Sequence, residues 1–206
     1  MDASTLLAAQ RIVPVVVIED AATAVPTAQA LLAGGLSAIE VTLRSAAAIA
    51  AIRAIAQDVP DMLVGAGSVR GAQALTQVRD AGARFAVSPG HSAALLEAAA
   101  AQSFPLVPGS ATPSEAMTLM DAGYTLQKLF PAEIVGGTAW LRAIAGPLPA
   151  LRFFPTGGIR LPQVADYLAQ PNVACIGGTW LTPSDSTPAE ITQRAKDALA
   201  QVPNRN

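Results

Sequence analysis

The sequence of 206 residues is poor in the side chains that form disulfides and bind metals. Its one cysteine, Cys175, excludes a disulfide within the chain. Its one histidine, His91, leaves no Cys/His cluster for a zinc site. The same scarcity disfavours metal-dependent and Ser–His–Asp catalysis, because both chemistries usually depend on histidine.

Charge and long apolar runs are also scarce. The 13 Lys and Arg residues nearly balance the 15 Asp and Glu residues, so the net charge is −2 and no basic stripe is available for a phosphate backbone. The apolar run at residues 12–18 is too short to span a bilayer, and no positive segment precedes it as in a signal peptide. We therefore expect a cytoplasmic protein that binds neither nucleic acid nor membrane.

Apolar side chains, by contrast, are abundant. Hydrophobic residues make up 51% of the chain and charged residues 14%, which excludes a disordered or fibrous protein. A chain of this length typically buries about 70% of its unfolded surface, enough for one full core. We therefore predict a single domain over residues 1–206.

A repeated pattern indicates how this domain is built. In three places an apolar helix end is followed by glycine and then by a strand-like run, with the glycines at residues 34–35, 82 and 123. Glycine adopts the left-handed conformation that ends a helix at low cost. Such helix–strand joints in series imply parallel strands linked by crossover helices.

The pattern predicts eight strands, at residues 12–18, 38–43, 62–66, 85–87, 105–107, 126–130, 152–155 and 173–176. It predicts helices at residues 23–33, 46–57, 72–81, 93–102, 114–122, 139–145, 161–168 and 189–200. Eight such units, preceded by a short N-terminal helix, predict an α/β fold of the (β/α)₈ barrel type. A doubly wound open sheet is the alternative, disfavoured because no Gly-x-Gly-x-x-Gly motif follows the first strand.

Ionisable residues interrupt two of these apolar strands. In the second strand, Glu40, Thr42 and Arg44 alternate with apolar residues and share one face, which would line the interior of a barrel. One interpretation is a buried Glu40–Arg44 ion pair that holds the strand, and the other is a functional site. The strand alone does not decide between them.

Lys128 interrupts the sixth strand. It is one of only two lysines, the other being Lys196 in the last helix. Lysine is rarely buried, and the centre of a parallel barrel offers its amine little solvent. We therefore interpret Lys128 as an amine able to attack a carbonyl and form a Schiff base. Either burial keeps this amine neutral, or Glu40 takes its proton; the sequence leaves both open.

Paired glycines follow the last two strands, at residues 157–158 and 177–178. Backbone amides in such turns can bind a phosphate, as is common after the seventh and eighth strands of a (β/α)₈ barrel. The alternative is two glycine-rich turns without a ligand. Of the remaining residues, His91 follows the fourth strand at the end where a substrate could touch it, but we expect this lone loop histidine to be solvated. We expect Cys175 to pack in the core.

Five segments stand out when they are taken together: 40–44 (EVTLR), 65–68 (GAGS), 128–133 (KLFPAE), 155–159 (PTGGI) and 176–180 (IGGTW). In this order and spacing they resemble the 2-keto-3-deoxy-6-phosphogluconate aldolase family, which also includes 2-keto-4-hydroxyglutarate aldolases. The resemblance covers nearly the whole chain. Its most distinctive parts are the segments around Lys128 and Thr156.

The resemblance implies a class I aldolase without metal or cofactor, on a (β/α)₈ barrel that usually forms a homotrimer. Its reaction would cleave 2-keto-3-deoxy-6-phosphogluconate to pyruvate and glyceraldehyde 3-phosphate in the Entner–Doudoroff route. The hydroxyglutarate substrate and 2-keto-3-deoxy-6-phosphogalactonate are alternatives. Two other classes stay open: a metal-free phosphosugar isomerase or epimerase with Glu40 as base, and a non-catalytic barrel that binds a phosphorylated metabolite.

The resemblance also implies roles for single residues. Lys128 matches the Schiff-base lysine, and Glu40 matches the general acid and base. Arg44 matches the arginine that holds the pyruvate carboxylate, and Ser68 stands where the family usually has a threonine that contacts the same group. Thr156 matches a position associated with substrate preference and favours the phosphogluconate substrate.

The rest of the substrate is expected to contact Pro89 and Phe130, and its phosphate to bind at Gly157, Gly158, Gly178 and Thr179. Thr179 replaces the serine that is common at this position and keeps a hydroxyl. His91 stands where the family more often has an aliphatic residue.

Overall fold

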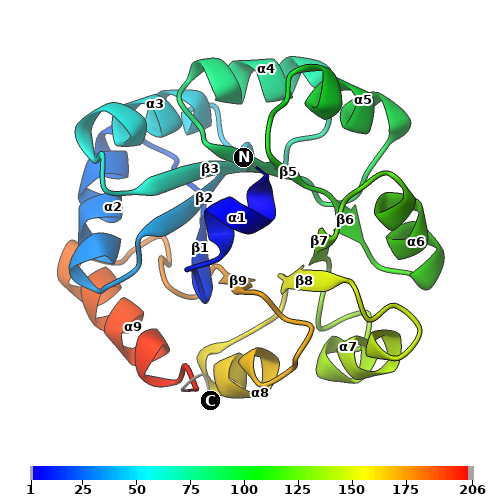
Figure 1. The fold of residues 1–206 in the computed structure, drawn as a ribbon. Helices are drawn as coiled ribbons and strands as arrows, with labels where there is room; N and C mark the ends of the chain where they lie inside the picture. The colour runs from blue at the N-terminus through cyan, green and yellow to red at the C-terminus, as the bar shows by residue number, and fades with distance from the viewer. Residues whose placement is uncertain (1, 204–206) are drawn as a thin grey trace.

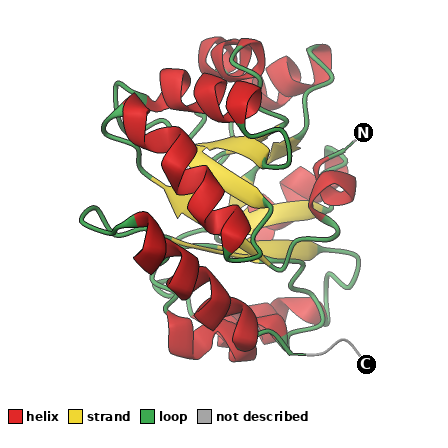
Figure 2. Ribbon diagram, turned by 90° about the vertical axis from the view of Figure 1, so that its left-hand side faces the viewer, coloured by secondary structure: helices red, strands yellow, loops and turns green. Residues whose placement is uncertain are grey.

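The computed structural model describes residues 2–203, in which helices surround a curled arrangement of parallel strands (Figures 1 and 2). Met1 and residues 204–206, which the predicted domain includes, lie outside the described residues. Within residues 2–203, every helix is too short or too polar to span a bilayer. The strands are β1 (Ile12–Val16), β2 (Ala38–Thr42), β3 (Leu63–Gly67), β4 (Phe85–Val87), β5 (Leu106–Val107), β6 (Gly109–Ser110), β7 (Leu126–Leu129), β8 (Arg152–Pro155) and β9 (Ile176–Gly178).

Except for the first helix, which precedes β1 and lies over one end of the strands, the helices follow strands in the chain and lie outside them in space (Figures 1 and 2). The α-helices are α1 (Ala3–Leu7), α2 (Ala24–Ala33), α3 (Ala48–Asp58), α4 (Ala72–Asp80), α5 (Ala93–Ala101), α6 (Pro113–Asp121), α7 (Gly137–Ala145), α8 (Val164–Leu168) and α9 (Pro188–Ala200). Two short 3₁₀ helices, η1 (Ala21–Thr23) and η2 (Leu161–Gln163), precede α2 and α8.

Hydrogen bonds join the strands into two parallel sheets. One sheet has the order β5-β4-β3-β2-β1-β9, and the other has the order β6-β7-β8. Pro108 separates β5 from β6 in the chain, and isolated parallel bridges join Phe153 to Val173 and Thr156 to Gly177. Because the sheets adjoin at both places, the strands form one curled arrangement that encloses a common interior (Figure 1).

The predicted strands are confirmed to within two residues, with two exceptions. The strand predicted at 105–107 is followed by β6, which the prediction missed because Pro108 has no N–H for the ladder and interrupts the pairing. The strand predicted at 173–176 is shifted along the chain. The residues that pair with β1 are Ile176, Gly177 and Gly178, so β9 begins at Ile176 and includes the two glycines. Val173 contributes a single bridge, so its apolar character reflects burial rather than a position in the ladder.

The three predicted glycine caps are confirmed. Gly35, Gly82 and Gly123 have φ angles of 94°, 96° and 90°, in the left-handed region. At the first cap the N–H of Leu36 donates to the carbonyl of Leu31 at 3.0 Å, closing the helix end before β2 begins. These caps let each helix reverse tightly into the next strand.

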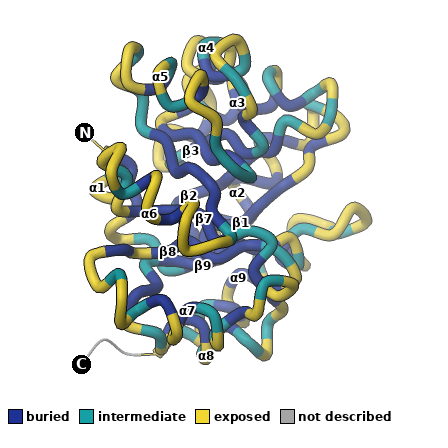
Figure 3. The backbone as a smooth tube through the Cα atoms, turned by 90° about the vertical axis from the view of Figure 1, so that its right-hand side faces the viewer, coloured by how far each residue is buried: buried dark blue, intermediate teal, exposed yellow. Residues whose placement is uncertain are grey.

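Two apolar clusters fill the fold, and Figure 3 shows the strands buried in its middle. The larger cluster lies between the helices and the outer face of the strands. The smaller one, here called the closed-end cluster, lies inside the curl, where α1 covers the amino ends of the strands (Figure 1). Its members are Ala3, Leu7, Val13, Ala38, Phe85, Val87, Val107, Leu126, Phe154 and Cys175, so the expectation that Cys175 packs in the core is confirmed.

Candidate active site

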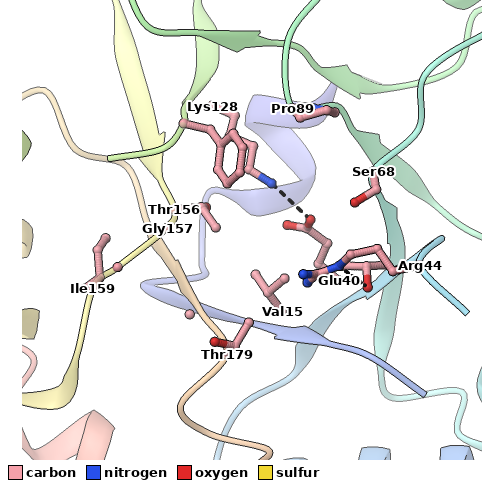
Figure 4. A pocket seen from close by; sticks show the side chains of 14 residues that line it. Val15, Glu40, Arg44, Ser68, Pro89, Lys128, Thr156, Gly157, Ile159 and Thr179 are labelled. Carbon is pink, nitrogen blue, oxygen red and sulfur yellow. Dashed lines mark hydrogen bonds and ion pairs between the residues drawn. The ribbon is translucent and has the colours of Figure 1, made fainter. Parts of the chain in front are cut away.

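The carboxyl ends of the strands surround a cavity of about 300 Å³ (Figure 4). All the residues assigned to the site from the sequence line this cavity: Glu40, Arg44, Ser68, Pro89, Lys128, Phe130, Thr156, Gly157, Gly158, Gly178 and Thr179. Val15, Thr42 and Ile159 complete the lining. Of these three, Thr42 had a signal in the sequence, its place on the polar face of β2, whereas Val15 and Ile159 look like ordinary apolar residues.

Lys128 and Glu40 form an ion pair inside the cavity (Figure 4). Nζ of Lys128 donates to Oε1 of Glu40 at 3.2 Å, and the two side chains are 6% and 0% exposed. The ring of Phe130 lies 5.2 Å from the same Nζ, where its π-face attracts a cation. A lysine amine is thus held almost without solvent beside a single carboxylate.

Glycines in β3 make room for this pair and for the closed-end cluster below it. A Cβ atom at Gly67 would lie 2.1 Å from Oε1 of Glu40, so a larger residue would displace the carboxylate. A Cβ atom at Gly65 would lie 2.2 Å from the ring of Phe85. The two glycines therefore serve the packing of the interior, in addition to any part they play at the end of the strand.

Thr42 orients Arg44. Nε of Arg44 donates to Oγ1 of Thr42 at 3.2 Å, and this hydroxyl donates to the carbonyl of Val16 on β1 at 3.1 Å. With Nε bound in this way, the planar guanidinium still has N–H groups available to a carboxylate. The ion pair of Glu40 is with Lys128, so the predicted alternative of a buried Glu40–Arg44 pair is wrong.

Two buried oxygens at the cavity have no hydrogen-bond partner within residues 2–203. They are Oε2 of Glu40 and Oγ1 of Thr156. Buried polar atoms are normally bonded, and leaving one unbonded typically costs about 1–3 kcal/mol. Both atoms are therefore placed to bind a ligand that enters the cavity.

Backbone conformation shapes both sides of the cavity. Ser68, directly after β3, has a φ of 58°, which is uncommon for a residue other than glycine and is often found at functional sites. Gly157 and Gly158, after β8, have φ angles of 103° and 84°. At Gly178, a Cβ atom would lie 1.4 Å from the ring of Trp180, so glycine is required for this tryptophan to pack on the turn.

His91 lies outside this cavity and keeps part of its surface exposed, so the structure does not contradict the expectation that it is solvated. It is half-buried, with Nδ1 3.0 Å from the carbonyl oxygen of Gly109. The loop after β4 packs directly on this glycine, since a Cβ atom there would lie 2.4 Å from the carbonyl oxygen of Pro89. Within residues 2–203, the acidic, cysteine and histidine side chains form no cluster of three or more that could hold a metal ion.

This arrangement has three chemical capacities. A sequestered amine beside a carboxylate can attack a carbonyl group and pass protons to its neighbour. A guanidinium fork next to it can bind a carboxylate. Across the cavity, glycine turns line the same space, and backbone N–H groups of such turns can bind an anion.

Comparison with known proteins gives one consistent result. The model of the KDPG and KHG aldolase family matches residues 4–197. The chain is 50% identical over 202 residues to the 2-dehydro-3-deoxy-phosphogluconate aldolase of Dickeya dadantii (strain 3937), covering 96% of this chain and 95% of that protein. It is 49% identical over 201 residues to the KHG/KDPG aldolase of Escherichia coli (strain K12), covering 96% and 94%. The crystal structure of the KDPG aldolase from Legionella pneumophila, with pyruvate captured at low pH as a covalent carbinolamine intermediate, has a TM-score of 0.92 and 41% identity, covering 95% and 97%.

Proposed function

The chain belongs to the KDPG and KHG aldolase family, and from this premise we propose that it cleaves 2-keto-3-deoxy-6-phosphogluconate to pyruvate and glyceraldehyde 3-phosphate through an imine on Lys128. One observation carries the proposal: Nζ of Lys128 lies 3.2 Å from Oε1 of Glu40, inside a cavity that Arg44 also lines. The covalent pyruvate adduct in the Legionella relative supports the same chemistry.

The reaction begins with attack of the Lys128 amine on the C2 carbonyl carbon. Glu40 first takes a proton from the Lys128 ammonium and gives it to the carbonyl oxygen as the freed amine forms the C–N bond; it then takes a second proton from the nitrogen, which leaves a neutral carbinolamine. Glu40 then returns a proton to the carbinolamine hydroxyl, which leaves as water, so that a protonated imine remains. One buried carboxylate within hydrogen-bond distance of Nζ can serve all these transfers.

Cleavage uses the imine as an electron sink. Glu40 accepts the proton of the C4 hydroxyl, the C3–C4 bond breaks, and its electron pair moves through C2 to the imine nitrogen. This step releases glyceraldehyde 3-phosphate and leaves an enamine. The enamine gains a proton at C3, and water then hydrolyses the imine to release pyruvate and the free Lys128 amine.

The rest of the cavity orients the substrate. Arg44 and Ser68 bind the carboxylate at C1, which places C2 next to Nζ of Lys128. The unpartnered hydroxyl of Thr156 is available to a hydroxyl of the sugar acid. Pro89 and Phe130 flank the substrate chain from the ends of β4 and β7.

The phosphate lies at the glycine turns. We assign it to the backbone N–H groups around Gly157, Gly158 and Gly178 and to the hydroxyl of Thr179, which all line the cavity. Gly157 and Thr179 lie across it from Arg44 (Figure 4). The curled sheet is, on this proposal, a complete (β/α)₈ barrel that forms one domain. The cytoplasmic location and the homotrimer expected from the sequence remain part of the same proposal.

A second substrate is favoured by one finding: the relative from Escherichia coli bears the name KHG/KDPG aldolase. 2-Keto-4-hydroxyglutarate would use the same imine and the same Arg44 contact, with a carboxylate in place of the distant phosphate. Comparing pyruvate release from this substrate, from 2-keto-3-deoxy-6-phosphogluconate and from the galactonate epimer, by coupling to lactate dehydrogenase, would rank the three. We expect the highest kcat/KM with the phosphogluconate substrate.

Trapping with borohydride tests the imine directly. Incubation with pyruvate and borohydride should add mass irreversibly at Lys128, located by peptide mass spectrometry. The Lys128→Ala variant should take up no label, while Lys196→Ala, the other lysine, should label like the wild type. Labelling at another residue, or none in the wild type, would refute the mechanism. In the latter case an isomerase or epimerase that uses Glu40 as base becomes the better explanation.

A further inference from the structure

The phosphate turn is held from behind by a residue that lies outside the cavity, Glu133. This residue follows β7 in the turn that leads to α7. Its backbone N–H donates to the carbonyl of Gly157 at 3.1 Å, and the N–H of Ala132 donates to the carbonyl of Thr156 at 2.9 Å. The segment after β7 is thus bonded along the segment after β8.

The side chain of Glu133 completes a ring of hydrogen bonds around the same turn. Oε2 of Glu133 accepts from Nε2 of Gln163 at 2.6 Å, and Oε1 of Gln163 accepts from the N–H of Arg160 at 2.9 Å. The turn from Gly157 to Arg160 is therefore tied to one residue at both ends, through its backbone at the start and through Gln163 at the finish. We call these contacts the Glu133 ring.

Tyr167 anchors the ring to α8. Its hydroxyl donates to Oε1 of Glu133, and its side chain is 1% exposed. Burial, and then the hydrogen bond and charge of Glu133, raise the pKa of Tyr167 above its usual value, so the phenol keeps the proton that it donates. The carboxylate therefore has a fixed partner on the helix side of the turn.

Two glycines fit closely around Glu133. A Cβ atom at Gly158 would lie 2.7 Å from Cβ of Glu133, and one at Gly137 would lie 2.9 Å from its Oε1 and 2.8 Å from the hydroxyl of Tyr167. The Glu133 side chain is thus in direct packing contact with the turn that it holds. Two successive left-handed glycines are intrinsically mobile, so their N–H groups need such support to keep one direction.

We propose that Glu133 is a positioning residue: through the Glu133 ring it holds the N–H groups of the 157–160 turn in the direction that binds the phosphate of the substrate. The inference rests on the proposed function, because it gives the turn its ligand. The carboxylate does not meet the phosphate, since its oxygens are bound to Gln163 and Tyr167. Remote binding energy of this kind aligns the reacting bond over Lys128.

The test separates two reactions of the same enzyme. Cleavage of 2-keto-3-deoxy-6-phosphogluconate uses the phosphate turn, whereas exchange of the methyl protons of pyruvate in heavy water uses the imine without any phosphate. Glu133→Ala should raise KM for the phosphorylated substrate about tenfold, as expected when hydrogen bonds that orient the turn are lost. Pyruvate exchange, followed by NMR, should stay near the wild-type rate.

Two further variants control the result. Glu133→Gln keeps the size of the side chain and can accept from Gln163 while donating to the Tyr167 hydroxyl, so it should restore KM. Asp166→Ala removes an acidic residue that lines the small cavity beside Glu133 and Tyr167 but is not part of the ring, and it should change neither reaction. A parallel loss of cleavage and exchange in Glu133→Ala would show a general structural role and overturn the proposal.

The remaining outcomes also test the positioning role of Glu133. An unchanged KM in Glu133→Ala, or a Gln variant as impaired as the Ala variant, would overturn the positioning role. Glu133 is exposed, so its variants should fold; if Glu133→Ala does not, Gln163→Ala opens the ring at its other link and must show the same split between KM and exchange. A wild-type enzyme that lacks pyruvate exchange would instead refute the proposed function, and the two failures are thereby distinguished.

Discussion

The interior of the curled sheet has a polar end and an apolar end, and the same strands supply both. Leu126 lies two residues before Lys128 on β7, and Ala38 lies two residues before Glu40 on β2. The first residue of each pair packs in the closed-end cluster, whereas the second lines the cavity. Because alternate residues of a strand share a face, both residues of each pair point into the interior. The first contributes to the apolar packing and the second to the cavity.

The two ends differ in how completely their groups are satisfied. The closed-end cluster buries apolar side chains, which is favourable without further partners. The open end buries polar atoms that have no hydrogen-bond partner among the described residues, among them Oε2 of Glu40 and Oγ1 of Thr156. Substitutions at the open end should therefore change kinetics more than unfolding, and substitutions at the closed end should do the reverse.

Among the substitutions that test this difference between the two ends, Glu40→Gln is expected to have the largest effect, a loss of turnover. The amide keeps the shape of the side chain and can still accept from Nζ of Lys128, but it cannot carry protons. Turnover should fall by roughly 10²–10⁴-fold, the usual contribution of a general acid and base. Steady-state kinetics give kcat, and equilibrium binding should show that pyruvate still binds.

Leu126→Ala is the matched control, two residues from Lys128 on the same strand. Truncating a buried leucine should lower the free energy of unfolding by about 2–5 kcal/mol, measured by chemical denaturation. The folded protein should keep kcat near the wild-type value. Unchanged turnover in Glu40→Gln would remove Glu40 from the mechanism, and a loss of turnover in Leu126→Ala comparable to that in Glu40→Gln would mean that the two ends are not separable.

A smaller effect is expected from Thr42→Val. Valine has nearly the same shape as threonine but offers Nε of Arg44 no acceptor, so the guanidinium loses its fixed orientation. A hydrogen bond of net worth about 0.5–1.5 kcal/mol corresponds to a rise of KM by roughly 2–10-fold. Substrate kinetics measure the change, with kcat less affected.

Thr42→Ser keeps the hydroxyl and serves as the control for this substitution. It should retain a KM close to that of the wild type. If Ser and Val variants raise KM equally, the methyl packing of Thr42 matters and its bond to Arg44 does not.

Much of the fold and of the candidate site could be predicted because their signals are local. A lysine in the apolar run of β7 and a glutamate in that of β2 contradict their surroundings, and this contradiction marks Lys128 and Glu40 without any knowledge of the fold. The glycine caps are equally local. So are the paired glycines at residues 157–158.

The rest depends on contacts between distant segments, which no local pattern specifies. Lys128 and Glu40 are 88 residues apart, and only the register of the strands brings them together. The need for glycine at Gly67 arises from the Glu40 side chain on the neighbouring strand. The Glu133 ring joins a turn after β7 to Tyr167 on α8, and its residues have no unusual composition.

The smallest expected effect comes from the closed end, where Cys175 is fully buried. Burial, and to a lesser degree the charge of Glu40, raises the pKa of the Cys175 thiol above its ordinary value of 9.0. The folded chain therefore keeps the thiol proton at a pH at which the unfolded chain releases it. The burial of the neutral thiol therefore contributes fully to the free energy of unfolding below about pH 9, and this contribution is lost as the pH rises further.

Comparing the wild type with Cys175→Ala isolates this term, because the other titrating groups are common to both chains. At pH 7 the wild type should have a larger free energy of unfolding than Cys175→Ala, because its buried sulfur atom makes packing contacts that alanine lacks. At pH 9, where half of the unfolded thiols are ionised, that advantage should shrink by about 0.4 kcal/mol in denaturant titrations under reducing conditions. A difference that stays constant with pH would mean that the thiol ionises as readily inside the curl as in water. The closed end would then be wet, and the contrast between the two ends would be lost.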